Sequence, residues 1–169
     1  MLTQLSYYNN INMDLFVSQF VNKVDKKGRI SLPSLFRNVL PKDSKNEIIL
    51  YKSFKYNSIE GCSSDRINEI AKRINKLDIF SDDQDDFATS IFSEIVPTNI
   101  DKEGRFLIPD NLKIHSNIST EATFVGQGYF FQIWEPRAAK ERQKKSRIRL
   151  IKEKKTLSSI IAKIDGEDA

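Results

Sequence analysis

The sequence predicts a β-rich α+β fold in which two tandem repeats, with short flanking helices, share one barrel-like core. Three observations predict this fold. The pattern D-K-x-G-R-x-x-x-P occurs twice, from Asp25 to Pro33 and from Asp101 to Pro109. Each copy is followed by an apolar stretch typical of strands, "EIILYKSF" and "EATFVGQGYFFQIW", and then by a charged stretch typical of a helix. Because the identities recur at a constant offset, we interpret the two halves as an internal duplication.

The order of the segments along the chain follows from these repeats and from charge. Residues 1–12 are polar and have no counterpart in the second half, so we expect a dispensable extension. After them we expect, in order, a first repeat over 13–77, an acidic connecting segment over 78–93, a second repeat over 94–142 and a basic tail over 143–169.

Each motif has the chemistry of a tight hairpin turn. Asp25 can bond to the backbone two residues on, and Gly28 can supply the positive φ that closes the turn. Arg29 then leaves the turn facing outward, and Ile30 and Leu32 alternate with polar residues as in a half-buried strand.

The second motif repeats this chemistry with Asp101 and Gly104 in the turn, and with Phe106 and Ile108 alternating after Arg105. The proline that closes each motif ends the strand and suits the start of a short helix, "PSLFRNVL" or "PDNLKIH". A lone two-stranded unit is marginal in water, so the copies are expected to pair about a pseudo-twofold axis.

Composition excludes several classes of protein. The chain of 169 residues has one cysteine, Cys62, and one histidine, His115. It therefore cannot form an intrachain disulfide or a Cys/His zinc cluster of its own. His115 has no glycine elbow or paired nucleophile nearby, so we predict no catalytic residues, no metal site and no cofactor. The sequence has neither an apolar run of membrane-spanning length nor a signal-peptide pattern, so we expect a cytoplasmic protein without a membrane segment.

The distribution of charge points to the two turns. The net charge is +4, yet residues 137–155 alone hold ten basic and two acidic side chains, so the rest of the chain is acidic on balance. Outside residues 137–155, the protein can therefore bind nucleic acid only through local basic patches. The candidate DNA-binding residues are Lys23, Lys26, Lys27 and Arg29 at the first turn, and Lys102 and Arg105 at the second.

A two-stranded element tipped by Arg29 fits the major groove of double-stranded DNA, and its guanidinium can donate two parallel bonds to a guanine edge or a phosphate. The alternative is that Arg29 pairs with Asp25 across the turn and only stabilises the hairpin. Arg37 and its counterpart Lys113 lie on the short helices, where a solvated face or a subunit contact is favoured over DNA.

The doubled motif, together with "VGQGYFFQIWEP", resembles the MraZ family over Met13 to Arg142. The resemblance implies two SpoVT/AbrB-type swapped-hairpin repeats and a ring-shaped homo-oligomer associated with the nucleoid. It also implies a sequence-specific transcriptional regulator of the division and cell-wall gene cluster, which reads short direct repeats upstream of its own operon. Family members place the motif arginine on DNA, which carries over to Arg29 and Arg105.

Other functions stay open. An antitoxin-like AbrB regulator would also bind a toxin. An RNA-associated or ribosome-associated factor would bind through the basic tail. A structural scaffold in division would form an oligomer without binding nucleic acid. The acidic "SDDQDDF" is either a solvated helical turn or a contact to a basic neighbour. The barrel would leave the apolar helix face of Ile70, Ile74 and Leu77 exposed to solvent. Because another copy of the chain could bury this face, we predict a homo-oligomer.

Overall fold

The computed structural model describes residues 14–41, 43 and 46–167. The expected dispensable extension over 1–12 lies outside these residues. The chain divides into two compact units, the first ending at Pro136 and the second beginning at Arg137.

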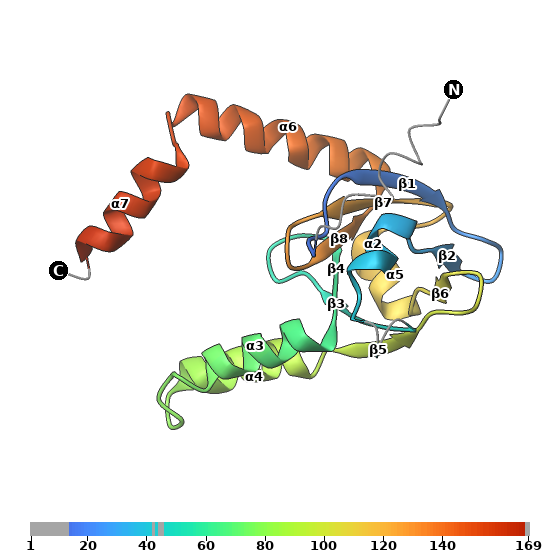
Figure 1. Ribbon diagram of the computed structural model, residues 1–169, viewed down its shortest axis with the longest axis horizontal. Coiled ribbons are helices and arrows are strands. Elements are labelled where there is room, and N and C mark those ends of the chain that lie inside the picture. The colour runs from blue at the N-terminus through green and yellow to red at the C-terminus, as the bar shows by residue number, and fades with distance from the viewer. Residues whose placement is uncertain (1–13, 42, 44–45, 168–169) are drawn as a thin grey trace. The chain divides into compact units, whose positions relative to one another are not determined.

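The first unit is a mixed α and β structure (Figure 1). Its strands are β1 (Gln19–Lys23), β2 (Arg29–Ser31), β3 (Glu47–Lys52), β4 (Ile59–Cys62), β5 (Val96–Asn99), β6 (Arg105–Leu107), β7 (Glu121–Gly126) and β8 (Phe131–Trp134). Its helices are α2 (Ser34–Val39), α3 (Ser64–Ile74), α4 (Asp82–Phe92) and α5 (Asp110–Ser116). The prediction of a chain with both strands and helices is confirmed, although helices hold more of the described residues than the β-rich expectation allowed.

Strand pairing interlaces the two halves of the chain. One six-stranded sheet has the order β1-β7-β8-β4-β3-β5, and β2 and β6 form a separate two-stranded sheet. All these pairs are antiparallel. β1 pairs with β7 and β5 pairs with β3, so the strand before each motif joins a strand that follows the other motif. Neither half can therefore complete its sheet alone.

No closed barrel is found among the described residues. The six-stranded sheet has free edges at β1 and β5, so it is open. β2 and β6 are only three residues long and pair with each other, which leaves the sheet without a strand to close it.

The core lies between the sheet and the two short helices. Phe36 of α2 is 0% exposed, and its ring contacts those of Phe16, Phe20, Phe124 and Phe131. The centroids of these ring pairs are 5.3, 5.6, 6.1 and 5.3 Å apart, respectively. These partners come from the N-terminal segment, β1, β7 and β8, so Phe36 joins both halves of the chain.

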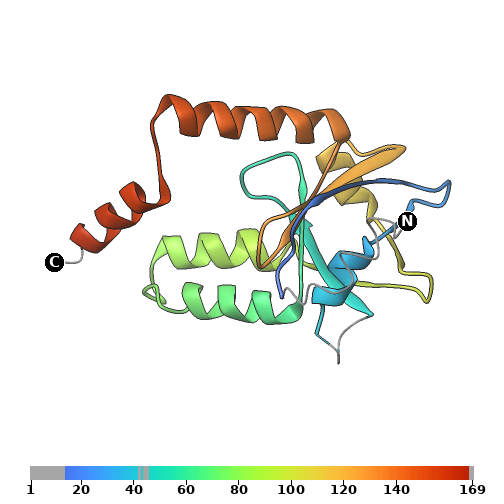
Figure 2. The same ribbon diagram turned by 45° about the horizontal axis from the view of Figure 1, so that its top comes forward.

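A helical hairpin of α3 and α4 lies within the stretch between the two motifs, with the two helices side by side (Figure 2). The Ser81 hydroxyl caps α4 by accepting from the Gln84 N–H at 3.2 Å. Ile74 is only 6% exposed, so the expectation that it needs a partner subunit for cover was wrong. Leu77, Ile79 and Phe80 at the connection remain exposed, Phe80 by 90%.

The second unit consists of α6 (Pro136–Lys152), which begins at the boundary residue, and α7 (Leu157–Glu167). The charged stretch after Trp134, which the sequence predicted as a helix, forms α6 over 17 residues. Across the described residues, every helix is too short or too polar to cross a membrane.

Candidate functional site

The first motif forms a turn that its aspartate holds together. The Asp25 carbonyl accepts from the Gly28 N–H at 2.9 Å, and its N–H donates to the Arg29 carbonyl at 2.8 Å. One carboxylate oxygen, Oδ1, accepts from the backbone N–H groups of Lys27 and Arg29 at 2.8 and 2.9 Å. Gly28 has a φ of +80°, a left-handed conformation that favours glycine.

The Asp25 side chain also holds the arginine. Its Oδ2 accepts from Arg29 Nε and Nη2, each at 2.8 Å. The backbone N–H of Arg29, followed by its guanidinium and the Lys27 N–H, lowers the pKa of Asp25. The pairing considered from the sequence as an alternative to DNA binding is therefore present. It engages two of the five guanidinium N–H bonds, so the same pair can orient the arginine toward a ligand.

The second motif repeats this geometry and adds one carboxylate. Asp101 Oδ1 accepts from the N–H groups of Glu103 and Arg105 at 3.0 and 2.8 Å, and Oδ2 accepts from Arg105 Nε at 2.9 Å. Gly104 has a φ of +79°. Arg105 Nη2 donates to Glu103 Oε2 at 2.9 Å, a contact for which the first turn, with Lys27 at the matching position, has no counterpart.

The ribbon of β2 and β6 brings both arginines to one face. Arg29 lies opposite Leu107, and Ser31 lies opposite Arg105. Since paired residues and residues two apart in a strand share a face, these four side chains point to the same side. The intervening Ile30 and Phe106 are buried in the core on the other side.

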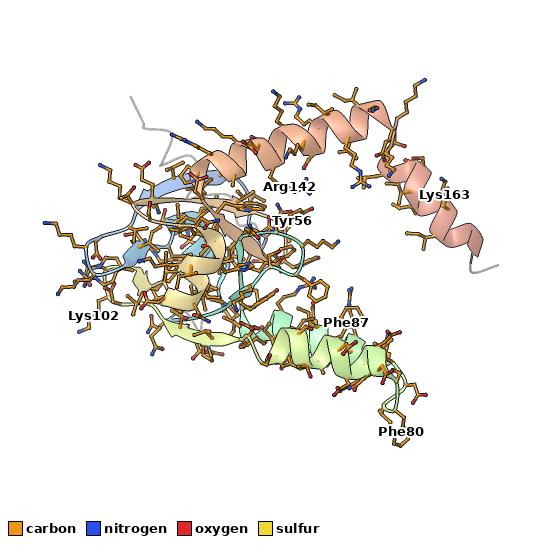
Figure 3. All side chains as sticks on the ribbon, turned by 180° about the vertical axis from the view of Figure 1, so that it is seen from behind. Tyr56, Phe80, Phe87, Lys102, Arg142 and Lys163 are labelled. Carbon is orange, nitrogen blue, oxygen red and sulfur yellow. The ribbon has the colours of Figure 1, made fainter. Side chains whose placement is uncertain are left out.

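This outward face carries a residue that the sequence reading missed. Leu107 is 55% exposed and lies on the ribbon beside the arginines. Its place after Arg105 in a strictly alternating strand was the signal that could have found it. The remaining predicted cations, Lys23, Lys26, Lys27 and Lys102, are all exposed, and Figure 3 shows Lys102 projecting from the second turn.

Arg37 and Lys113 lie on the short helices, as the sequence predicts, and each side chain reaches a turn. Arg37 of α2 reaches the second turn, where a methyl group built at Gly104 would overlap its guanidinium. Lys113 of α5 reaches the first turn, where a methyl group built at Gly28 would lie 3.7 Å from its Nζ. Each helix therefore places its cation at the turn of the opposite motif. Both side chains are half-buried, and the solvated face or subunit contact expected for them stays a prediction.

One cavity lies beside the second turn, and another lies along the helical hairpin of α3 and α4. A cavity of about 310 Å³ lies between α2 and the second turn, with Arg37, Asp101, Lys102 and Glu103 among its lining residues. A groove of about 570 Å³ runs along α3 and is lined by Arg66, Glu69, Lys72, Arg73, Lys76 and Tyr129. Four of those six side chains are basic.

Burial shifts the pKa of two titratable groups inside the fold. Burial raises the pKa of the Cys62 thiol to about 12, so it is protonated and unreactive at neutral pH. Burial and the neighbouring Glu60 raise the pKa of Tyr51. His115 Nε2 lies 3.1 Å from the Tyr56 carbonyl oxygen, which links α5 to the loop between β3 and β4.

Comparison with known proteins agrees with these features. A family model described as "MraZ protein, putative antitoxin-like" matches residues 91–158. The chain is 43% identical over 124 residues to the transcriptional regulator MraZ of Rickettsia rickettsii (strain Sheila Smith), which covers 73% of this chain and 83% of that protein.

Two further relatives carry the same name. The Pelagibacter ubique (strain HTCC1062) protein is 46% identical over 124 residues, covering 73% of this chain and 80% of its own length. The Rickettsia bellii (strain OSU 85-389) protein is 42% identical over 130 residues, covering 76% of this chain and 87% of its own length. On the doubled turn and on this similarity over most of its length, the chain belongs to the MraZ family.

Proposed function

We propose that this protein is a sequence-specific DNA-binding transcriptional regulator in the cytoplasm, associated with the nucleoid. The observation that carries the proposal is the ribbon face on which Arg29 and Arg105 lie together, each oriented by its own aspartate. The name of the relatives, transcriptional regulator MraZ, supports it. Its target would be short direct repeats upstream of its own operon in the division and cell-wall gene cluster.

The chemistry of recognition follows from the pairing. At the first turn, the Asp25 carboxylate accepts from Arg29 Nε and Nη2 and so fixes the plane of the guanidinium. Nη1 and the second Nη2 hydrogen of Arg29 are left to donate. Those two groups can form a fork that matches guanine O6 and N7 in the major groove. The exposed lysines of the turns would serve phosphates, which set position and salt dependence rather than sequence.

We further propose that the fold consists of two AbrB-type swapped-hairpin repeats about a pseudo-twofold axis. The exchange of strands in the β1–β7 and β5–β3 pairs supports this arrangement. So do the pairs of β2 with β6 and β4 with β8, which join corresponding elements of the two halves. The axis would pass through the ribbon and relate its two arginines.

A binding titration tests the proposed function. Duplex DNA from upstream of the protein's own gene is expected to bind, and a scrambled duplex and structured RNA are expected to compete poorly. Preference for RNA would instead favour the basic α6, whose charge is the observation behind the RNA-binding alternative. Binding to neither would contradict the proposal. A nuclease footprint on the upstream duplex would locate the direct repeats.

The second turn should bind DNA more tightly when its extra carboxylate is removed. Glu103 engages Arg105 Nη2 and places a negative charge where DNA would place another. Glu103→Lys is expected to tighten binding and to steepen the salt slope by about one unit, as one more phosphate is neutralised. Glu141→Lys on α6 makes the same charge change elsewhere. If both substitutions tightened binding equally, the effect would be one of net charge.

We also propose that the protein is a homo-oligomer, with a ring as its form. The first turn of α4 carries Asp82, Asp83 and Asp85, while α3 carries the basic groove described above. Within the described part of the chain, these acidic residues form no ion pair with α3. Together with exposed Phe80 at the end of the hairpin (Figure 3), they give complementary surfaces for another copy.

Light scattering is expected to give a mass of several chains at micromolar concentration. Replacing Asp83 and Asp85 with lysine should lower that mass, because the reversed charges would repel the basic groove along α3. A matched double reversal at Glu47 and Glu121, which are exposed at the starts of β3 and β7, should leave it unchanged. A monomeric mass for the unaltered protein would contradict the oligomer.

A further inference from the structure

We infer that each DNA-binding turn is completed by a cation from the other half of the chain: Lys113 belongs to the first turn and Arg37 to the second. This inference rests on the proposed function, because it assigns two further phosphate-binding residues to the same surface. The order of residues along the chain suggests the opposite grouping, since Arg37 follows the first motif and Lys113 follows the second.

The second turn shows the closer contact. A side chain at Gly104 would collide with the guanidinium of Arg37, so that guanidinium lies directly over the turn glycine. Arg37 Nη1 donates to the Leu32 carbonyl at 2.9 Å, and the Leu32 N–H donates to the Gly104 carbonyl at 2.9 Å. This chain of bonds fixes Arg37 beside Lys102 and Glu103, with which it lines one cavity.

The first turn shows the related contact with a lysine. Nζ of Lys113 is 3.7 Å from the position of a methyl group built at Gly28, and the Leu107 side chain lies 3.4 Å from the same position. The Ile108 N–H donates to the Gly28 carbonyl at 3.1 Å, which anchors the segment leading into α5 against this turn. The ammonium group therefore adds to the charge of Lys26 and Lys27.

Both cations suit phosphates better than bases. The guanidinium of Arg37 lies over the turn glycine Gly104, whereas Arg105 lies on the outward ribbon face. A cation beside the residue that contacts the bases meets the sugar-phosphate backbone that flanks those base pairs. In this arrangement neither half of the chain could bind one DNA segment with a complete set of charges.

Cross-linking from single cysteines tests the crossed grouping, in which Lys113 belongs to the first turn and Arg37 to the second. Cys62 is buried, so a photoreactive thiol reagent should modify only an introduced cysteine, and the unaltered protein is the control. Lys27→Cys, Lys102→Cys, Arg37→Cys and Lys113→Cys would each be labelled and bound to the upstream duplex. We expect position 113 to mark the same nucleotides as position 27, and position 37 the same as position 102.

Affinity measurements test the same assignment of Lys113 and Arg37 without cross-linking. Lys113→Ala and Arg37→Ala are each expected to weaken duplex binding by about threefold to tenfold and to flatten the salt slope by about one unit. Lys55→Ala, in the exposed loop between β3 and β4, should change neither. If Arg37→Ala loses its folded circular dichroism spectrum, Arg37→Gln keeps an unbranched polar side chain and removes the charge.

The possible results separate this inference from the proposed function. If position 37 marks the nucleotides of position 27, or neither helix position reaches DNA, the crossed grouping is overturned while DNA binding stands. Unchanged affinity and salt slope in folded Arg37→Ala and Lys113→Ala would overturn it as well. If the unaltered protein binds no duplex, the proposed function itself fails.

Discussion

Replacing Phe36 with alanine is expected to lower the free energy of unfolding by about 3 to 5 kcal/mol, the range for a large buried aromatic side chain. Phe36 is fully buried, and four other phenylalanine rings surround it. Removing the ring would leave a cavity between α2 and the sheet. The surrounding rings belong to separate strands and a separate segment, so they cannot all move in to fill it.

Urea denaturation followed by circular dichroism measures this loss. Phe54→Ala is the matched control, because Phe54 is 68% exposed and only stacks on Phe87, with ring centroids 6.1 Å apart. We expect it to cost less than about 1 kcal/mol. Similar losses in the two variants would show that the aromatic cluster around Phe36 does not dominate the stability of the core.

Arg29→Ala is expected to weaken binding to the upstream duplex by about 1 to 3 kcal/mol, the value of a bidentate base contact. Arg105→Ala should cost less. At the first turn, Lys23, Lys26, Lys27 and Arg29 face one acidic residue, whereas Lys102 and Arg105 at the second turn face two. The tertiary structure adds one cation to each turn, so this difference between the turns persists.

Titrations at two salt concentrations separate base reading from charge. Lys27→Ala should flatten the salt slope by about one unit without changing sequence preference, because a lysine of this kind neutralises a phosphate. Circular dichroism would check that each variant is folded, since Arg29 also pairs with Asp25. Equal losses for Arg29→Ala and Arg105→Ala would show that local charge does not rank the two turns.

Much of the local structure was predictable from the sequence. The positions of the two turns, the strands that leave them and the helices that follow them come from aspartate, glycine and proline at fixed spacing. These residues act on their own backbone: Asp25 and Asp101 accept from N–H groups two and four residues on, and Gly28 and Gly104 supply a positive φ. Such bonds need no partner from elsewhere in the chain.

The elements outside the two motifs were predicted in part. A charged stretch typical of a helix located the α3 segment, whereas the burial of Ile74 was not predicted. The charged stretch after Trp134 was predicted as a helix, and it forms α6 over 17 residues. The barrel expected from the duplication is not closed among the described residues, since β2 and β6 pair with each other and form a sheet of their own.

The sequence by itself determined the doubled turn, its cations and the resemblance to a family, because each depends on residue types at short spacing. Only the tertiary structure decided which residues meet across the two halves. It brought Arg29 and Arg105 to one face of the ribbon, and it crossed Arg37 and Lys113 to the opposite turns. The physical reason is that strand pairing over long sequence separations sets these neighbours, and local propensity contains no information about such pairing.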